Sequence, residues 1–226
     1  YMSADTPYNG ILVAHGVGQG KTCTGISIAE NYKNNIKSEN KKIYILTPSS
    51  TLDETWKNEI FNISKETSKT PEEKDVNKQC TGTFYTDFYN TLNKVTEEGK
   101  KRRMARFIKE FYEIKGYQTF VNTIKKNVAK FMEQNKSLSY EAAQLIYIKE
   151  TFSNSVFIMD EVHMTRLGGS DDKNKIAPPY LELIARYADN TKFVLLSATP
   201  IFDKPEEIVW LLNILLWNDR KAPLLE

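Results

Sequence analysis

Four short apolar runs, each followed by polar residues, stand at wide intervals along the chain. They are Gly10–Ala14, Ile43–Leu46, Val156–Met159 and Phe193–Leu196. Runs of this length, bounded by turn-forming residues, are typical of strands buried on both faces. Between the runs apolar residues recur at helical spacing, as Leu52, Trp56 and Ile60 do after the second run. Alternating strands and helices predict an α/β fold, with a doubly wound, mainly parallel sheet and helices on both faces.

The patterns between these runs predict the remaining elements. A helix is expected from about Lys21 toward Lys33, and residues 62–80, rich in Lys, Glu, Ser and Thr, predict a loop. From 80 to 152 the pattern is mostly helical, with a helix starting near Asp87 and another capped by Ser139. A short strand at Tyr112–Lys115 is compatible with the same pattern. We therefore expect one domain over residues 1–226, with a mostly helical insertion at 80–152.

Composition narrows the class of protein. Hydrophobic residues make up 40% and charged residues 27%, as in folded chains. The formal net charge of +2 does not by itself predict a nucleic-acid binder, so such a surface would be a local patch. The densest basic run, Lys100–Arg103 with Arg106, is a candidate, although a run of this kind is more often a solvated helix face.

The cysteines and the hydropathy of the chain indicate in which cellular compartment to expect the protein. Cys23 and Cys80 have neither zinc-ligand spacing nor the pattern of a disulfide framework, which favours a reducing, intracellular location. The longest apolar run, Ile208–Trp217, is far shorter than the roughly 20 residues of a membrane span. We expect no membrane partner.

The first apolar run leads into a glycine-rich segment that ends in Gly-Lys-Thr. The expected phosphate-binding positions are Gly16, Val17, Gly18, Gln19, Gly20, Lys21, Thr22 and Cys23. Glycines let backbone N–H groups face an anion, and the helix N-terminus adds partial positive charge. Lys21 is predicted to reach the β- and γ-phosphates of ATP, and Thr22 to bind Mg²⁺. The first position of G-x-x-x-x-G-K-[ST] is His15, which leaves an ordinary glycine-rich turn as the alternative.

The third apolar run delivers Asp160-Glu161-Val162-His163 at its end. Ligands of open parallel sheets bind at the carboxyl ends of the strands. Asp160 is therefore predicted to hold Mg²⁺, and Glu161 to polarise the attacking water, which makes Lys21, Asp160 and Glu161 the catalytic set. An isolated Asp-Glu pair is usually a solvated turn, but here it shares the chain with Gly-Lys-Thr.

Three motifs, in this order, resemble motifs I, II and III of superfamily 2 helicases and translocases. They are Gly18–Thr22, Asp160–His163 and Ser197–Thr199, and Thr47-Pro48-Ser49 is similar to motif Ia. Longer blocks resemble the helicase-like transcription factors of large cytoplasmic DNA viruses, relatives of the poxvirus early transcription factor small subunit and nucleoside triphosphatase I. These blocks are His15–Cys23, Gln79–Gly82 and Ser197–Ile208.

The resemblance implies the first RecA-like domain of a motor that uses ATP and Mg²⁺ to act on nucleic acid, DNA rather than RNA, in viral transcription. It implies that His163, Ser197 and Thr199 couple hydrolysis to nucleic-acid contact. It also implies backbone contacts to nucleic acid from Thr47, Pro48, Ser49, Tyr117 and Gln118. Alternatives stay open, because these side chains can equally cap strand ends, fill the core or, for His163, be a satisfied neutral histidine.

The resemblance further implies a second RecA-like domain that supplies arginine fingers, and transcription machinery as a partner. Too few residues follow Thr199 to form that domain, so we expect a part of a larger protein that alone hydrolyses ATP weakly or not at all. A viral source would place it in the host cytoplasm or the virion. A remodeller-type or restriction-type DNA translocase and a non-catalytic interaction module are the competing functions.

Overall fold

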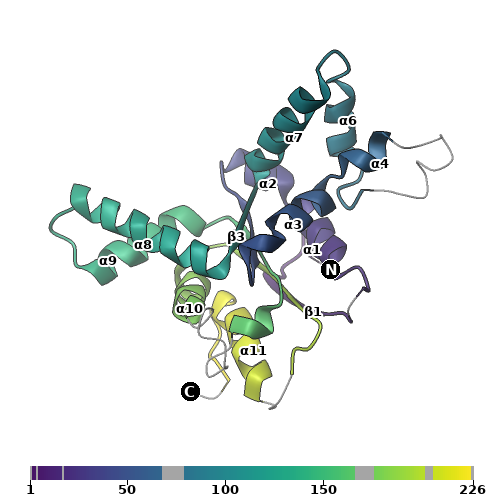
Figure 1. The fold of residues 1–226 in the computed structure, drawn as a ribbon. Helices are drawn as coiled ribbons and strands as arrows, with labels where there is room; N and C mark the ends of the chain where they lie inside the picture. Colours follow the sequence, from purple (N-terminus) through teal and green to yellow (C-terminus); the bar gives the residue numbers. More distant parts are fainter. Residues whose placement is uncertain are drawn as a thin grey trace.

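The central feature of the protein is a single five-stranded parallel sheet (Figure 1). The computed structural model describes residues 2, 3, 5–16, 18–67, 79–165, 176–201 and 206–224. The strands are β1 (Gly10–Ala14), β2 (Ile43–Thr47), β3 (Tyr112–Gly116), β4 (Val156–Met159) and β5 (Lys192–Ser197). Their order in the sheet is β1-β5-β4-β2-β3. The predicted α/β class and parallel sheet are confirmed, and each predicted strand is present.

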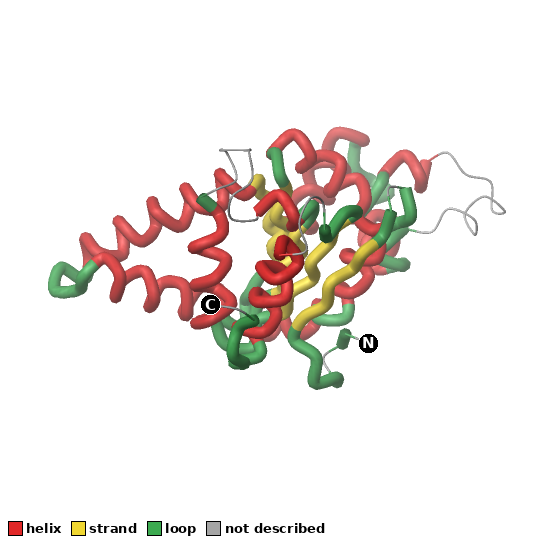
Figure 2. The backbone as a smooth tube through the Cα atoms, turned by 90° about the horizontal axis from the view of Figure 1, so that it is seen from below, coloured by secondary structure: helices red, strands yellow, loops and turns green. Residues whose placement is uncertain are grey.

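Helices cover both faces of this sheet (Figure 2). One face carries α1 (Lys21–Glu30), α2 (Lys33–Ser38), α3 (Asp53–Ile60), α6 (Phe84–Asn90) and α7 (Glu97–Phe111). The other carries α8 (Tyr117–Gln134), α9 (Tyr140–Phe152), α10 (Ala177–Tyr187) and α11 (Glu206–Asn218). Short helices η1 (Ser50–Leu52), α4 (Ile63–Thr67) and η2 (Val162–Thr165) lie in the connections. Helices α8 and α9 form a hairpin that projects from one side of the molecule (Figures 1 and 2).

Alternate residues of the central strands supply two separate cores. In β4, Val156 and Ile158 pack with the helices of the α1 side, whereas Phe157 and Met159 pack with those of the α8 side. Because strand side chains alternate between faces and both faces are covered, a continuous apolar run is needed. This is the physical reason that the apolar runs predicted the strands.

The segment predicted as a mostly helical insertion contains α6, α7, α8 and α9, but also β3. Strand β3 pairs with β2 from Ile43 opposite Tyr112 to Thr47 opposite Gly116. The segment therefore contributes an edge strand to the central sheet. None of the described helices is long and apolar enough to cross a membrane.

Three local predictions differ from the structure in their boundaries. The helix expected to run toward Lys33 ends at Glu30, because Asn31 and Tyr32 form a turn whose side chains donate hydrogen bonds to the backbone oxygens of residues 2 and 3. The helix expected near Asp87 begins at Phe84. Part of the loop expected at 62–80 forms α4, and residues 68–78 of that loop lie outside the described residues. The predicted cap of α9 is confirmed, since the Ser139 hydroxyl accepts from the Ala142 N–H at 3.2 Å.

The cysteines also differ from the prediction, which gave them no disulfide. Cys23 and Cys80 are joined by a disulfide bond. The bond connects the first turn of α1 to the turn before α6, and the Ser27 hydroxyl donates to the Cys80 carbonyl beside it. A separation of 57 residues gave no sign of the pairing, because only the folded chain brings the two turns together.

Candidate active site

The polar clusters after β1 and β4 border one cleft at the carboxyl edge of the sheet. The cleft has a volume of about 280 Å³. Its lining residues are Gly16, Gly18, Gly20, Lys21, Thr22, Cys23, Glu59, Asp160 and Glu161. All of them except Glu59 were predicted from the sequence. Two further residues of the glycine loop were predicted, Gln19 and Val17. Gln19 does not line the cleft, and Val17 lies outside the described residues.

The glycine loop has the geometry of an anion-binding turn. Gly18 and Gly20 have φ angles of 77° and 74°, in the left-handed region that favours glycine. The Gln19 side chain folds back within the loop, where its Oε1 accepts from the Gly16 N–H at 3.1 Å. Gly20 is the N-cap of α1 and provides no side-chain cap. The first N–H groups of α1 thus have no capping side chain, as is typical of helices that bind anions.

Lys21 and Glu161 are paired across the cleft. The Lys21 Nζ lies 2.5 Å from the Glu161 Oε1, and both side chains are mostly shielded from solvent. Glu161 has a φ of 44°, a conformation that is costly for a non-glycine residue and is concentrated at functional sites. The structure therefore holds the predicted phosphate-binding lysine directly against the predicted water-polarising carboxylate.

Asp160 lies at the base of the cleft and is only 8% exposed. Its Oδ2 accepts a hydrogen bond from the Trp56 Nε1 at 3.2 Å, and its Oδ1 accepts from the Glu161 N–H at 3.0 Å. Burial raises the pKa of Asp160, and the neighbouring Glu161 charge raises it further, while Lys21 and the two hydrogen bonds oppose the shift. The sequence marked Trp56 only as an apolar position at helical spacing and did not predict this contact.

The cleft also fits a magnesium ion. Magnesium is usually held in nucleotide sites by one or two protein oxygens together with phosphates. Asp160 and Thr22 provide one carboxylate and one hydroxyl on the same cleft. No group of three or more His, Cys, Asp or Glu side chains able to hold a metal occurs within the described ranges, which would be the pattern of an all-protein metal site.

His163 and Ser197, which are predicted to couple hydrolysis to nucleic-acid contact, are in direct contact. The His163 Nδ1 lies 2.9 Å from the Ser197 Oγ and 3.4 Å from the Glu161 Oε2. Ser197 is fully buried, and its hydroxyl also accepts from the Thr199 N–H at 3.1 Å. The residues after β4 and those at the end of β5 thus form one connected group, although the coupling role stays a prediction.

Two of the residues predicted to contact nucleic acid have buried side chains. Thr47 is fully buried and donates from its hydroxyl to the Ser49 carbonyl at 3.0 Å. Tyr117 is also fully buried, and its hydroxyl donates to the Asp160 carbonyl at 2.9 Å. Neither side chain reaches the surface. Ser49 and Gln118 are exposed and Pro48 is half-buried, so their contacts stay predictions.

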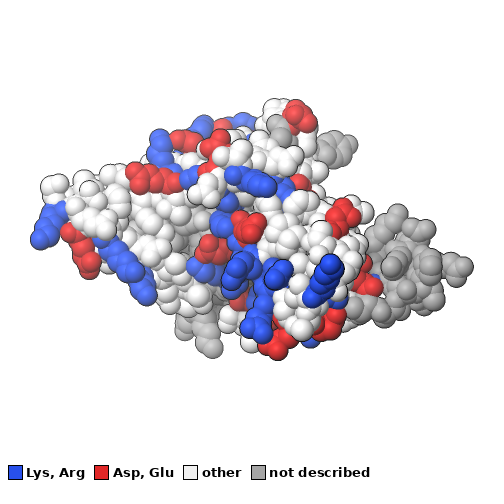
Figure 3. Space-filling view, turned by 90° about the horizontal axis from the view of Figure 1, so that it is seen from above, with Lys and Arg blue, Asp and Glu red and all other residues white. Residues whose placement is uncertain are grey.

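The basic run on α7 lies on a mixed surface. Lys100 pairs with Glu97 at 2.7 Å, and Arg102 pairs with Glu98 at 3.0 Å. Figure 3 shows basic and acidic side chains interspersed over the face of the molecule seen from above. This arrangement favours a solvated helix face over a nucleic-acid patch.

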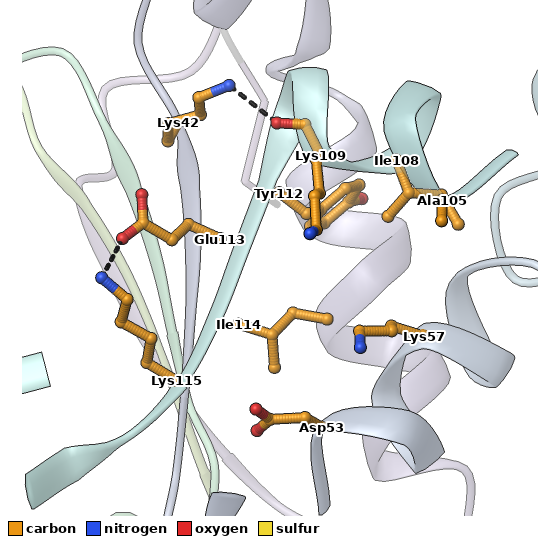
Figure 4. Close-up of a pocket in the computed structure, with 10 residues that line it drawn as sticks. All are labelled: Lys42, Asp53, Lys57, Ala105, Ile108, Lys109, Tyr112, Glu113, Ile114 and Lys115. Carbon is orange, nitrogen blue, oxygen red and sulfur yellow. Dashed lines mark hydrogen bonds and ion pairs between the residues drawn. The ribbon is translucent and has the colours of Figure 1, made fainter. Parts of the chain in front are cut away.

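A second, larger cavity lies beside the edge strand, between α3, α7 and β3 (Figure 4). Its volume is about 490 Å³. It is lined by Lys42, Asp53, Lys57, Ala105, Ile108, Lys109, Tyr112, Glu113, Ile114 and Lys115. None of the predicted site residues borders it. It shares only helix α3 with the cleft, through Asp53 and Lys57 on one side and Glu59 on the other.

The parallel sheet and the glycine-loop cleft define a P-loop NTPase with a RecA-like fold. Residues 4–202 match the family described as Type III restriction enzyme, res subunit, and the chain belongs to this family of helicase-like superfamily 2 domains. The predicted resemblance to superfamily 2 is confirmed.

The relatives include proteins of large DNA viruses. The chain is 31% identical over 222 residues to a predicted ATP-dependent RNA helicase of Acanthamoeba polyphaga mimivirus, covering 96% of this chain and 31% of that protein. It is 29% identical over 224 residues to a predicted helicase of Invertebrate iridescent virus 3, covering 96% of this chain and 19% of that protein. The chain therefore spans about a fifth to a third of these relatives.

A solved structure shares the fold. The DEAD-box helicase Mss116, bound to ssRNA and UDP-BeF, matches with a TM-score of 0.50 and 14% identity. The match covers 94% of this chain and 35% of that one. It supports the RecA-like architecture and nothing finer.

Proposed function

We propose that this chain is the ATP-binding half of a nucleic-acid-dependent motor ATPase that acts on DNA in viral transcription. The observation that carries the proposal is the single cleft that brings together Lys21, Thr22, Asp160 and Glu161. A non-catalytic interaction module has no chemical need for these four groups on one cleft. Viral relatives named as helicases support the same class of activity.

The Lys21–Glu161 pair supplies the first step of the mechanism. The γ-phosphate of ATP competes with Glu161 for the Lys21 ammonium, because phosphate carries more negative charge than a carboxylate. Once Lys21 binds phosphate, the Glu161 carboxylate is free to orient a water molecule and accept its proton. Thr22 and Asp160 would hold Mg²⁺, which neutralises charge on the phosphate oxygens.

The link to nucleic acid runs through His163 and Ser197. Their hydrogen bond connects Glu161, beside the cleft, to the polar turn after β5. A change at that turn on nucleic-acid binding alters the position of His163 and therefore of Glu161. A second RecA-like domain in the full-length protein would add the arginine that completes the site, worth about 10³–10⁵ in rate.

RNA is the competing substrate, because the mimivirus relative is named as an RNA helicase. Transcription-coupled DNA translocation and RNA unwinding both use this cleft in the same way. The choice therefore depends on the polymer that stimulates hydrolysis.

The test is the ATPase rate of the full-length protein with no polymer, single-stranded DNA, double-stranded DNA and RNA. Stimulation by DNA alone supports the proposal, and stimulation by RNA alone transfers the function to RNA. Lys21→Ala is expected to abolish stimulated hydrolysis, because the γ-phosphate loses its cation. Lys37→Ala, at an exposed lysine on α2, is the matched control and should keep the wild-type rate. Wild-type turnover by Lys21→Ala, or no stimulation by any polymer, contradicts the motor function.

A further inference from the structure

We propose that Trp56 is a positioning residue that fixes the Asp160 carboxylate for binding the metal–nucleotide complex. The proposal rests on the proposed ATPase function and extends it to a side chain outside the helicase motifs. Trp56 lies on α3, and its indole N–H donates to the Asp160 Oδ2 at 3.2 Å. It does not line the cleft, so it acts through Asp160 alone.

Asp160 is held through both its carboxylate and its backbone. Trp56 binds one carboxylate oxygen and the Glu161 N–H binds the other, at 3.2 and 3.0 Å. The Tyr117 hydroxyl binds the backbone carbonyl of the same residue at 2.9 Å. Of the two carboxylate contacts, the one from Glu161 belongs to the neighbouring residue and moves with Asp160. Within the part of the chain that the structure describes, Trp56 is the hydrogen-bond donor that ties the carboxylate to a different part of the fold.

Trp56 is itself rigidly placed. Its side chain is 2% exposed and belongs to the core on the α1 side of the sheet. An indole N–H is a hydrogen-bond donor only, so its partner here is an oxygen of the ionised carboxylate, and the direction of the hydrogen bond cannot be reversed. A buried hydrogen bond to a charged group is stronger than one between neutral groups. The bond therefore fixes which lone pairs of Asp160 face the cleft.

The size of the effect follows from related metal sites. Loss of a hydrogen bond that orients a metal ligand typically weakens metal affinity by about 10–100-fold. Trp56→Phe keeps an aromatic ring in the core and removes only the N–H donor. We expect this variant to bind the metal–nucleotide complex about tenfold more weakly.

The experiment measures Mn²⁺ binding to the full-length protein by electron paramagnetic resonance, with a non-hydrolysable ATP analogue at saturation. Mn²⁺ substitutes for Mg²⁺ and reports binding without turnover. Lys57→Ala is the matched control, because Lys57 is the next residue on α3 and lines the separate cavity of Figure 4. Its ammonium pairs with Glu54 of the same helix. The control should bind Mn²⁺ as the wild type does.

A second measurement separates positioning from general damage. Binding of the analogue in EDTA does not involve Asp160, so Trp56→Phe should leave that dissociation constant unchanged. In an Asp160→Asn background, Trp56→Phe should cause no further loss of Mn²⁺ affinity, since residues that act through one another are not additive. The proposal is overturned if Trp56→Phe weakens analogue binding equally with and without metal. It is also overturned if the losses of Mn²⁺ affinity in the double variant are additive.

Nuclear magnetic resonance of the wild type tests the contact without any substitution. The Trp56 indole N–H resonance should shift when Mg²⁺ and the analogue are added, whereas the Trp210 indole, which donates to Thr165, should not. An unmoved Trp56 resonance contradicts the proposal. If the wild type binds neither Mn²⁺ nor the analogue, the proposed ATPase function fails instead, so the two failures are distinguishable.

Discussion

Individual polar side chains at the strand ends have very different roles despite similar chemistry. Thr47 and Tyr117 direct their hydroxyls inward, to the carbonyls of Ser49 and Asp160. Ser197 is buried as well, but its hydroxyl meets His163 beside the cleft. A hydroxyl at the end of a strand can bond inward or outward, and the residue type alone does not distinguish the two. This is why the sequence did not predict that the side chains of Thr47 and Tyr117 are buried.

The His163–Ser197 contact leads to a prediction for single residues. Ser197→Ala should still bind ATP, but its polymer-stimulated rate should fall at least about tenfold, because the removed hydroxyl links the two motifs. A tenfold loss of rate corresponds to about 1.4 kcal/mol. The comparison of stimulated and basal ATPase rates checks it. Adding His163→Ala should cost little more. Ser38→Ala, at an exposed serine at the end of α2, serves as the control. Equal losses of the basal and stimulated rates in Ser197→Ala would contradict coupling.

At the scale of elements, α1 must lie close to the sheet to present the phosphate loop. A Cβ at Gly25 would lie 3.0 Å from a Leu196 methyl and 3.2 Å from an Ile158 methyl. These are side chains of β5 and β4, the strands that carry Ser197 and lead to Asp160. The glycine therefore sets the distance between the loop helix and the two strands opposite it.

Gly25→Val is expected to force α1 away from the sheet. Overpacking of this kind costs about 1–3 kcal/mol in the free energy of unfolding, and the displaced loop should bind an ATP analogue more weakly. Urea denaturation and an analogue titration measure both effects. Ser27→Val, on an exposed position of the same helix, controls for the lower helix propensity of valine. A variant as stable as this control would show that α1 tolerates the added methyl groups.

The elements show how far sequence reasoning extends. Strands and the Gly-Lys-Thr and Asp-Glu sites could be predicted, because two-sided burial leaves continuous apolar runs and parallel strands bring their ends to one edge. The positions of Trp56 and Glu59 near the cleft could not be predicted, because they depend on how α3 packs against the sheet. The end of α1 depends on contacts of Asn31 and Tyr32 with residues 2 and 3, which are also tertiary.

At the scale of the whole molecule, the disulfide joins the phosphate-loop helix to the segment that contains α6 to α9. Cys23 and Cys80 enclose a loop of 57 residues in sequence separation. Closing a loop of this size in the unfolded chain stabilises the fold by about 2–4 kcal/mol. The same bond holds the first turn of α1 against the turn before α6.

Reduction with dithiothreitol is therefore expected to lower the free energy of unfolding by about 2–4 kcal/mol. Urea denaturation with and without the reductant gives the difference. Cys80→Ser should show the same loss and no further response to reductant. A wild-type protein whose unfolding is insensitive to dithiothreitol would show that the cross-link adds no stability.

The sheet order has a consequence for the protein during its synthesis. Strand β1 precedes the other four strands in the chain, and in the described sheet it is an edge strand that pairs with β5, with Gly10 opposite Phe193 and Ala14 opposite Ser197. At translation speeds of about 5–20 residues per second, its partner emerges roughly 10–40 s later. Until then the strand that supports the phosphate loop has no neighbour in the sheet. A nascent chain therefore gains its nucleotide cleft only after β5 has been synthesised, so that a late strand of this segment completes the support of an early one.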